Sequence, residues 1–215
     1  MVEIKMIDII SLLLIAYLIG SFSSAIFLSK KIFKTDIRNH GSKNAGSTNM
    51  FRVFGKKWGM LVFVIDVLKG FVCTSLFYIL NHENIGLQEQ FLLQIGLSFA
   101  SVLGHVFPIY YHFKGGKGVA TLLGVIIGLQ PLIALYSFSL FIVVFLLTRY
   151  VSLSSITAGI IYPVWIYYCI GTQETWLYFI FGCIIALFLL LTHRNNIIRL
   201  LNGTENRFNF KKKEE

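Results

Sequence analysis

Seven apolar segments, separated by short polar links, dominate this 215-residue sequence. They cover residues 7–29, 59–80, 91–111, 118–129, 131–148, 153–171 and 175–192. An α-helix needs about 20 apolar residues to cross a bilayer, where the backbone must satisfy its own hydrogen bonds. Charged residues make up only 13% of the chain, too few to cover a water-facing surface. The sequence therefore predicts an all-α, polytopic integral membrane protein with seven transmembrane helices.

Two of these segments leave room for another interpretation. The first passes the small residues Ser21-Phe22-Ser23 and continues to Leu28, so we expect a retained helix and not a cleaved signal peptide. The fourth segment is short, and Gln130-Pro131 separates it from the fifth. Residues 118–148 could instead form one long tilted helix, which would change the side on which every later loop lies.

The basic residues predict the orientation of the chain in the membrane. Seventeen of the nineteen Lys and Arg residues lie in four stretches: 30–58, 112–117, 149–152 and the tail after 192. The alternate links 81–90 and 172–174 carry glutamates and no Lys or Arg. Because cytoplasmic loops are enriched in Lys and Arg, we expect the amino terminus outside and the carboxyl terminus in the cytoplasm. Residues 1–215 then form a single membrane domain.

Three of the cytoplasmic stretches share glycines, hydroxyls, amides and cations, with almost no carboxylates. They are Gly41 to Asn49 with Arg52, Gly104 to Thr121, and His193 to Glu205. Glycine lets backbone N–H groups approach an anion, and a following helix amino terminus adds partial positive charge. We therefore expect phosphate-sized binding sites on one surface, built from the loops 30–58 and 112–117 and the tail 193–215.

The glycine-rich segment Gly115-Gly-Lys-Gly118 directly precedes the fourth apolar segment. An anion there would meet backbone amides, a helix dipole and the two lysines Lys114 and Lys117. The segment is not a Walker A loop, since Gly118 follows the lysine and Tyr111 stands where that motif needs glycine. The alternative is a plain turn between helices with lysines at the inner surface.

Two pairs of polar residues are spaced three apart. His193 and Asn196 share a helix face and could hold a hydroxyl between imidazole and carboxamide, although a histidine there could also be merely interfacial. Asp66 and Lys69 lie within the second apolar segment, where ionisable residues are functional candidates. For that pair a mutually satisfied ion pair that supports the preceding loop is the favoured interpretation.

Three long motifs resemble those of the bacterial acyl-phosphate:glycerol-3-phosphate acyltransferase family, PlsY. They are G-S-x-N-x-G-x-T-N-x-x-R from Gly41 to Arg52, G-H-x-x-P with F-K-G-G-K-G-V-A-T from Gly104 to Thr121, and H-R-x-N-I-x-R-L-x-x-G-x-E from His193 to Glu205. They occur in the family's order, and the resemblance covers essentially the whole chain. None of the five histidines is followed by Asp at the fifth position, so the H-x-x-x-x-D dyad of the other large class of glycerolipid acyltransferases is absent.

The resemblance implies transfer of a fatty acyl group from acyl phosphate to the 1-hydroxyl of sn-glycerol 3-phosphate. The products would be 1-acylglycerol 3-phosphate (lysophosphatidic acid) and inorganic phosphate, in phospholipid biosynthesis. It also implies a multi-pass protein of the bacterial inner membrane with its active site facing the cytoplasm. The partners would be the two substrates and membrane lipids, with no cofactor, metal, nucleic acid or obligate protein partner.

The resemblance further implies direct, substrate-assisted transfer without a covalent acyl-enzyme. We expect Ser42, Arg52 and Lys117 around the phosphates, and His193 and Asn196 orienting the glycerol hydroxyl. The other expected substrate-binding residues are Asn44, Thr48, Asn49, Lys114, Gly115, Gly116, Gly118 and Ser154. Glu205 is expected to brace the loops rather than act as a base.

Two other functions would suit a basic polytopic chain. A transporter of a phosphorylated anion should have inverted repeats and a site near the middle of the membrane. The sequence contains no second copy of any motif, and its polar residues fall on one surface. A non-catalytic scaffold for lipid enzymes is the other alternative.

Overall fold

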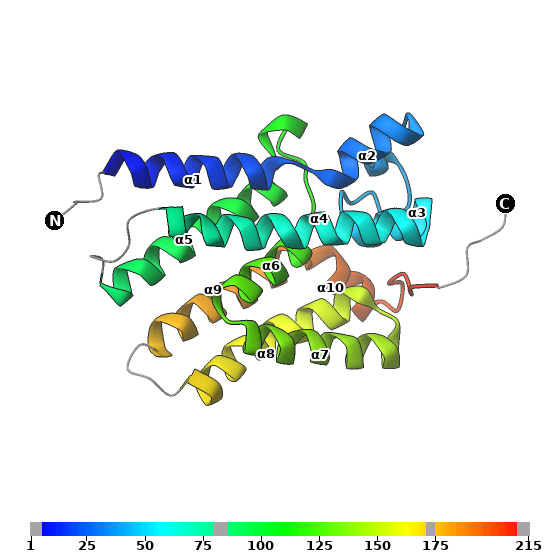
Figure 1. Ribbon diagram of the computed structural model, residues 1–215. Helices are drawn as coiled ribbons and strands as arrows, with labels where there is room; N and C mark the ends of the chain where they lie inside the picture. Colours follow the sequence, from blue (N-terminus) through cyan, green and yellow to red (C-terminus); the bar gives the residue numbers. More distant parts are fainter. Residues whose placement is uncertain (1–5, 80–85, 171–174, 210–215) are drawn as a thin grey trace. The chain divides into compact units, whose positions relative to one another are not determined.

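The structure is a computed structural model that describes residues 6–79, 86–170 and 175–209. Glu83, Glu174 and the basic run 211–213 lie outside the described residues, as do residues 81–85 of the link 81–90. Within the described part every regular element is a helix (Figure 1). The α-helices are α1 (Met6–Ser21), α2 (Ser24–Phe33), α3 (Ser47–Phe54), α4 (Lys56–Ser75), α5 (Leu87–Val106), α6 (Val119–Leu129), α7 (Pro131–Thr148), α8 (Val151–Ile170), α9 (Thr175–Thr192) and α10 (Arg194–Leu201). Short 3-10 turns cover Ile37–Asn39, Leu76–Ile79 and Ile109–Tyr111.

The chain divides into two compact units, Met1–Leu129 and Gln130–Glu215. Among the described helices, four are long and apolar enough to cross a membrane by themselves. Two bent pairs, α1 with α2 and α9 with α10, raise the number of candidate spans to six. The predicted class, an all-helical integral membrane protein, is confirmed.

The first predicted span is not one continuous helix. Residues 22 and 23 separate α1 from α2, and the two helices are bent by 41°. The side chain of Ser23 accepts a hydrogen bond from the amide of Ile26 at 3.4 Å, so it caps α2. A serine in this position satisfies an amide that has no partner inside its own helix, and so stabilises a new helix start. The expected unbroken helix over 7–29 is therefore wrong.

The short helix α6 is bounded at both ends by the chain around it. The amides of Gly115 and Gly116 bond to the carbonyls of Val106 and His105 at 3.1 and 3.2 Å, so the chain doubles back along the end of α5 before α6 begins. At its other end α6 stops at Leu129, and Pro131 is the first residue of α7. The predicted separation at Gln130-Pro131 is confirmed, and a single helix over 118–148 is excluded.

Glycines bring α6 against α4. A Cβ atom added to Gly70 would collide with the carbonyl of Thr121, and one added to Gly124 would collide with the carbonyl of Val67. Gly128 lies beside Thr74, one turn further along both helices. Later residues of α4 thus contact later residues of α6, so the two helices run parallel. Such small-residue contacts let backbones approach closely in a membrane.

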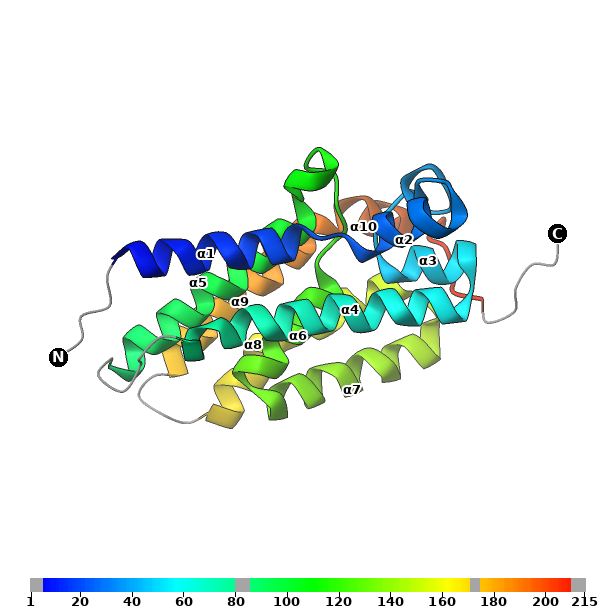
Figure 2. The same cartoon turned by 45° about the horizontal axis from the view of Figure 1, so that its top comes forward.

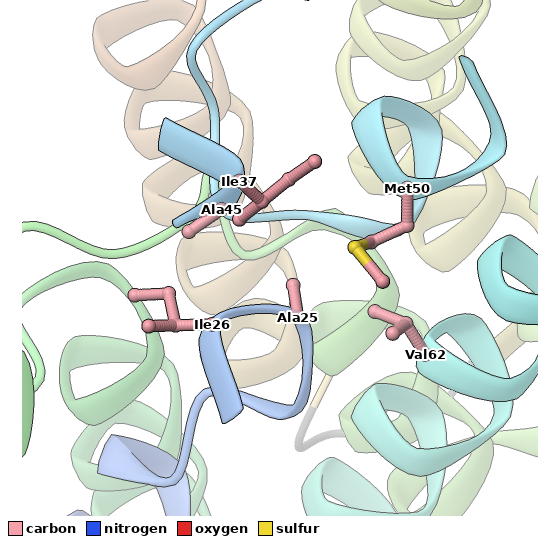
Figure 3. Packing of buried hydrophobic residues seen from close by; sticks show 6 residues of the cluster. All are labelled: Ala25, Ile26, Ile37, Ala45, Met50 and Val62. Carbon is pink, nitrogen blue, oxygen red and sulfur yellow. The ribbon is translucent and has the colours of Figure 1, made fainter. Parts of the chain in front are cut away.

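The polar loop 34–55 is held by a buried apolar cluster. Figure 3 shows its members, which come from α2, the loop, α3 and α4: Ala25, Ile26, Ile37, Ala45, Met50 and Val62. All of them are at most 1% exposed, so the loop is fixed by core packing and not by polar contacts alone. In Figures 1 and 2 this loop lies where α2, α3 and the beginning of α4 meet.

The second unit contains α7, α8, α9 and α10. Gly159 of α8 packs against the side chain of Leu189 of α9, and Gly182 of α9 packs against Pro163 of α8. At the end of α9 the chain bends by 65° into α10, and His193 occupies the bend. The chain after α10 returns to the α7–α8 link, where the amide of Phe208 bonds to a backbone carbonyl at 2.8 Å.

Candidate functional site

Asn49 organises the first polar loop from its interior. Its side chain is 1% exposed, and its Oδ1 accepts the amide of Ser42 at 2.9 Å. Its Nδ2 donates to the carbonyls of His40 and Asn44 at 2.9 and 3.0 Å, and reaches that of Ile37 at 3.2 Å. Both ends of the amide are therefore used within the loop. Asn49 thus shapes the loop that carries Ser42, and the substrate contact expected of it stays a prediction.

The predicted phosphate ligands of this loop lie at the surface. Gly41 and Lys43 have φ of 57° and 58°, so the chain makes a tight left-handed turn on each side of Ser42. Ser42 and Arg52 are both exposed, while Asn44 and Thr48 are half-buried. The turn holds Ser42 outward, where its side chain is accessible to solvent.

Arg38 joins this loop to the glycine-rich segment. It donates Nε and Nη2 to the two carboxylate oxygens of Asp36 at 3.0 and 2.7 Å. Its Nη1 donates to the carbonyls of Tyr111 and Lys114 at 3.0 and 3.1 Å. The guanidinium beside Asp36 lowers the pKa of that carboxyl to about 2, although partial burial opposes the shift. Sequence reasoning assigned Arg38 no role, because a single arginine in a basic loop carries no signal of its partners.

The glycine-rich segment uses two of its amides internally. Gly115 and Gly116 donate their N–H groups to backbone carbonyls at the end of α5. The glycines are also needed for close packing, since a Cβ atom on Gly116 would strike the ring of His105 and lie 3.1 Å from the carbonyl of Ala45. The substrate contacts expected at these two glycines stay predictions.

The glycine-rich segment also carries two lysines that could attract an anion. Lys114 is exposed and Lys117 is half-buried. Gly118 has φ of 84° and directly precedes α6. The first-turn amides of a helix have no partner within it, and the helix dipole favours an anion at this end. The first unit thus brings the Ser42 loop and the Lys114–Gly118 segment together.

A buried charged cluster lies inside the first unit. Asp66 and Lys69 form an ion pair with 3.0 Å between Oδ1 and Nζ, as predicted, and their side chains are 2% and 5% exposed. His105 is also buried, and its Nδ1 lies 2.7 Å from Nζ of Lys69. The sequence did not single out His105, because only the fold brings it beside the ion pair.

In the second unit, the bend between α9 and α10 fixes the tautomer of His193. Its Nδ1 lies 2.9 Å from the carbonyl oxygen of Leu189. A carbonyl can only accept, so Nδ1 carries a proton, and in the neutral form of the ring Nε2 is an acceptor. His193 and Asn196 are 2% and 5% exposed, and the amide of Asn196 bonds to the carbonyl of His193 at 2.8 Å. The two residues therefore lie within one turn, as their spacing predicted.

Glu205 braces the second unit. Its Oε1 accepts Nδ2 of Asn196 at 2.7 Å and the hydroxyl of Ser152 at 2.8 Å, and its Oε2 accepts Nε of Arg199 at 2.7 Å. Burial raises the pKa of Glu205, but these three hydrogen bonds more than offset that effect and the pKa is lowered. A carboxylate held in this way is a poor base at neutral pH, so the predicted bracing contact is confirmed.

Ser154 is hydrogen-bonded within its own helix. It is fully buried, and its hydroxyl donates to the carbonyl of Tyr150 at 2.8 Å within α8. A serine hydroxyl has one hydrogen, which this bond uses. The phosphate contact expected of Ser154 stays a prediction. In the described part of the chain, no three His, Cys, Asp or Glu side chains gather as metal ligands would.

Comparison with known proteins gives consistent matches over nearly the whole chain. A family model described as glycerol-3-phosphate acyltransferase matches residues 10–203. The chain is 41% identical to a glycerol-3-phosphate acyltransferase of Fusobacterium nucleatum, over 92% of this chain and 97% of that protein. It is 42% identical to the glycerol-3-phosphate acyltransferase of Aquifex aeolicus, with the same two coverages.

Two crystal structures share the fold. Both are of PlsY, an integral membrane glycerol 3-phosphate acyltransferase, one in a glycerol 3-phosphate form and one in a lysophosphatidic acid form. The first has a TM-score of 0.82 at 38% identity and the second a TM-score of 0.79 at 37% identity. Each match covers 94% of this chain and 96% of the crystallised one.

Proposed function

Because the chain belongs to the PlsY family of glycerol-3-phosphate acyltransferases, we propose that it acylates the 1-hydroxyl of sn-glycerol 3-phosphate and makes lysophosphatidic acid. The observation that carries this function is the match over residues 10–203, within which all three polar motifs begin. The second crystal structure, in its lysophosphatidic acid form, contains the expected product.

The acyl donor in this proposal is acyl phosphate. It is a mixed anhydride with a good leaving group. The attacking hydroxyl therefore needs little activation by a base. The glycerol oxygen forms the new ester bond, the bond between the acyl carbon and the phosphate oxygen breaks, and the donor's phosphate takes the hydroxyl proton. Two features support this direct route: Glu205 is engaged by three hydrogen bonds, and Asp36 is paired with Arg38.

Ser42, Arg52 and Lys117 bind phosphate in this proposal. Ser42 stands on an exposed left-handed turn, and Arg52 is exposed on the helix that follows. Arginine and lysine favour phosphate because their hydrogen bonds to it are charge-assisted. Lys114 and Gly118 border the same segment, and Asn44 and Thr48 border the Ser42 turn. Preorganised donors of this kind stabilise the charge that develops as the acyl group is transferred.

His193 and Asn196 orient the glycerol hydroxyl. With its proton on Nδ1, a neutral His193 has Nε2 as the acceptor that orients the hydroxyl before reaction, and the donor's phosphate takes the proton only as the ester bond forms. Asn196 is held by Glu205, so its position is fixed. Holding two reactants in attack geometry can supply about 7–11 kcal/mol of the barrier reduction.

We further infer seven spans, with the amino terminus outside and the carboxyl terminus in the cytoplasm of a bacterial cell. In that arrangement residues 1–215 are one membrane domain. The loops 30–58 and 112–117 and the tail 193–215 line one active site at the cytoplasmic face. The distribution of Lys and Arg supports this orientation.

The decisive experiment measures phosphate release by the purified protein in detergent. Release should require palmitoyl phosphate and glycerol 3-phosphate together, and palmitoyl-CoA should not replace the donor. Exchange of labelled glycerol 3-phosphate across sealed vesicles, with no acylated product, would instead identify a transporter.

A further inference from the structure

The buried ammonium group of Lys69, on α4, has a complete set of partners. The Nζ atom of Lys69 lies 3.0 Å from Oδ1 of Asp66, 3.1 Å from the carbonyl of Phe22 and 2.7 Å from Nδ1 of His105. An ammonium group has three hydrogens, so each one has an acceptor. Asp66 Oδ1 also accepts the hydroxyl of Ser24 at 3.1 Å. The cluster thus joins the α1–α2 break, α4 and the end of α5.

The lysine determines which tautomer of His105 is present. An ammonium can only donate, so Nδ1 accepts and the proton of the neutral ring is on Nε2. This edge of the ring faces the glycine-rich segment, because a Cβ atom on Gly116 would collide with Nε2. The backbone of His105 holds the same glycine, since its carbonyl accepts the amide of Gly116 at 3.2 Å.

We propose that Asp66, Lys69 and His105 act as positioning residues for the acyl transfer, by fixing Gly116 and with it the phosphate-binding Lys117. The inference rests on the proposed function, in which Lys117 binds a substrate phosphate. The ion pair orients the imidazole, the imidazole and its own carbonyl fix Gly116, and Lys117 follows in the chain. None of the three contacts substrate in this proposal.

A merely structural ion pair would have a different consequence. Its loss would lower the amount or stability of the folded protein and leave the binding of both substrates unchanged. A positioning cluster instead acts on the substrate whose phosphate meets the glycine-rich segment. The two roles therefore differ in whether one KM changes selectively.

His105→Asn is the first test, because the Oδ1 of asparagine can replace Nδ1 as acceptor for Lys69 while the ring edge beside Gly116 is lost. The second is the double variant Asp66→Asn with Lys69→Met, which removes both charges together and leaves no uncompensated buried charge. Thr74→Val is the matched control, since Thr74 and Ser98 join the same two helices through a buried hydrogen bond of 3.0 Å.

Phosphate release is measured with each substrate varied in turn, alongside the melting temperature in detergent. We expect His105→Asn and the double variant each to raise the KM of the same substrate at least about tenfold, with the other KM within about twofold of wild type. Combining the two should add little further, since they disrupt one unit. Thr74→Val should lower the melting temperature and change neither KM.

Folded variants with both KM values unchanged, or with both raised equally, would overturn the inference. A selective change in Thr74→Val as well would do the same. If His105→Asn does not fold, the double variant decides alone. Failure of the wild-type protein to release phosphate would reject the proposed function itself, whereas an active wild type with insensitive variants rejects only the positioning role.

Discussion

The Nη1 atom of Arg38 lies 3.1 Å from the backbone oxygen of Lys114, a residue 76 positions later in the chain. This bond and the one to Tyr111 connect the loop that carries Ser42 with the segment that carries Lys117. Asp36 holds the guanidinium on its other side through two hydrogen bonds. The two predicted phosphate-binding stretches of the first unit are thus joined by a side chain outside all three motifs.

Replacing Arg38 should separate the two stretches. Arg38→Ala leaves two carbonyls without their charged donor and leaves Asp36 with Lys30 as its charged partner, which should cost about 2–3 kcal/mol of unfolding free energy. We expect kcat/KM to fall at least about tenfold as the ligands lose their relative positions. Arg38→Lys should recover little, since a lysine cannot make the bidentate contact. An Arg38→Ala enzyme with unchanged kcat/KM would show that the connection is not needed for activity.

Asn49 should be sensitive to a change of one atom. Asn49→Asp keeps the acceptor for the Ser42 amide but places a carboxylate oxygen opposite two or three carbonyls. We expect a loss of about 2–3 kcal/mol in unfolding free energy, measured by thermal or chemical unfolding in detergent. A stable Asn49→Asp protein with a raised KM would contradict the internal role and favour direct substrate binding. Asn39→Asp, at an exposed position of the same loop, is the control.

Ser42 and Arg52 should both be essential to turnover. Removing one preorganised donor from a developing charge costs about 100-fold to 1000-fold in rate, so Ser42→Ala and Arg52→Ala should each lose at least 100-fold. Lys56→Ala removes an exposed cation of the same loop and should leave the rate near that of wild type. Near-normal rates in both alanine variants would exclude this loop from the site. An acyl group trapped on Ser42 would establish a covalent route.

Because Nδ1 and Nε2 of His193 have different roles, substitutions that replace one nitrogen or the other should differ in activity. The side-chain oxygen of glutamine can stand near the position of Nε2, and that of asparagine near the position of Nδ1. We expect His193→Ala and His193→Asn to lose at least about 100-fold in kcat, and His193→Gln to retain clearly more activity. Equal loss in the asparagine and glutamine variants would argue against an acceptor role for Nε2. Full activity in His193→Gln and His193→Ala would make the ring merely interfacial.

The stability of the protein should depend on Glu205 in a predictable pH range. Its folded pKa is lowered below the usual 4.5, so its contribution is complete above that value and is lost as the pH falls through the folded pKa. The melting temperature of wild type should therefore exceed that of Glu205→Gln most at pH 6–7. The difference should shrink as the pH drops below 4.5. A constant difference from pH 7 to pH 3 would show that the carboxylate charge is not what stabilises the bend.

The features that could be predicted from sequence depend on local patterns. The length of the apolar segments predicted a membrane protein, and Pro131 predicted the end of α6. The spacing of Asp66 and Lys69 predicted their ion pair. Each of these follows from neighbours along one helix or link, so no knowledge of the fold was needed.

The features that could not be predicted depend on distant partners. The break at residues 22 and 23 contains neither proline nor glycine, and the carbonyl it exposes is satisfied by Lys69 from another helix. The inward roles of Asn49 and the amides of Gly115 and Gly116 likewise follow from contacts that only the folded chain creates. The residue types predicted that these groups would form hydrogen bonds, but they could not predict which partners the folded chain would provide.

The spacing of α4 and α6 has a consequence for reading variation among relatives of this protein. Gly70 and Gly124 admit no side chain, because each stands against a backbone carbonyl of the opposite helix. In a saturation mutagenesis screen these two positions should be as intolerant as Arg52, although neither has a functional group to offer a substrate. If relatives all have glycine at such a position, the reason is the close contact of two backbones and not a role in catalysis. Sequence comparison alone cannot separate these two reasons, whereas assays of the folded variants can.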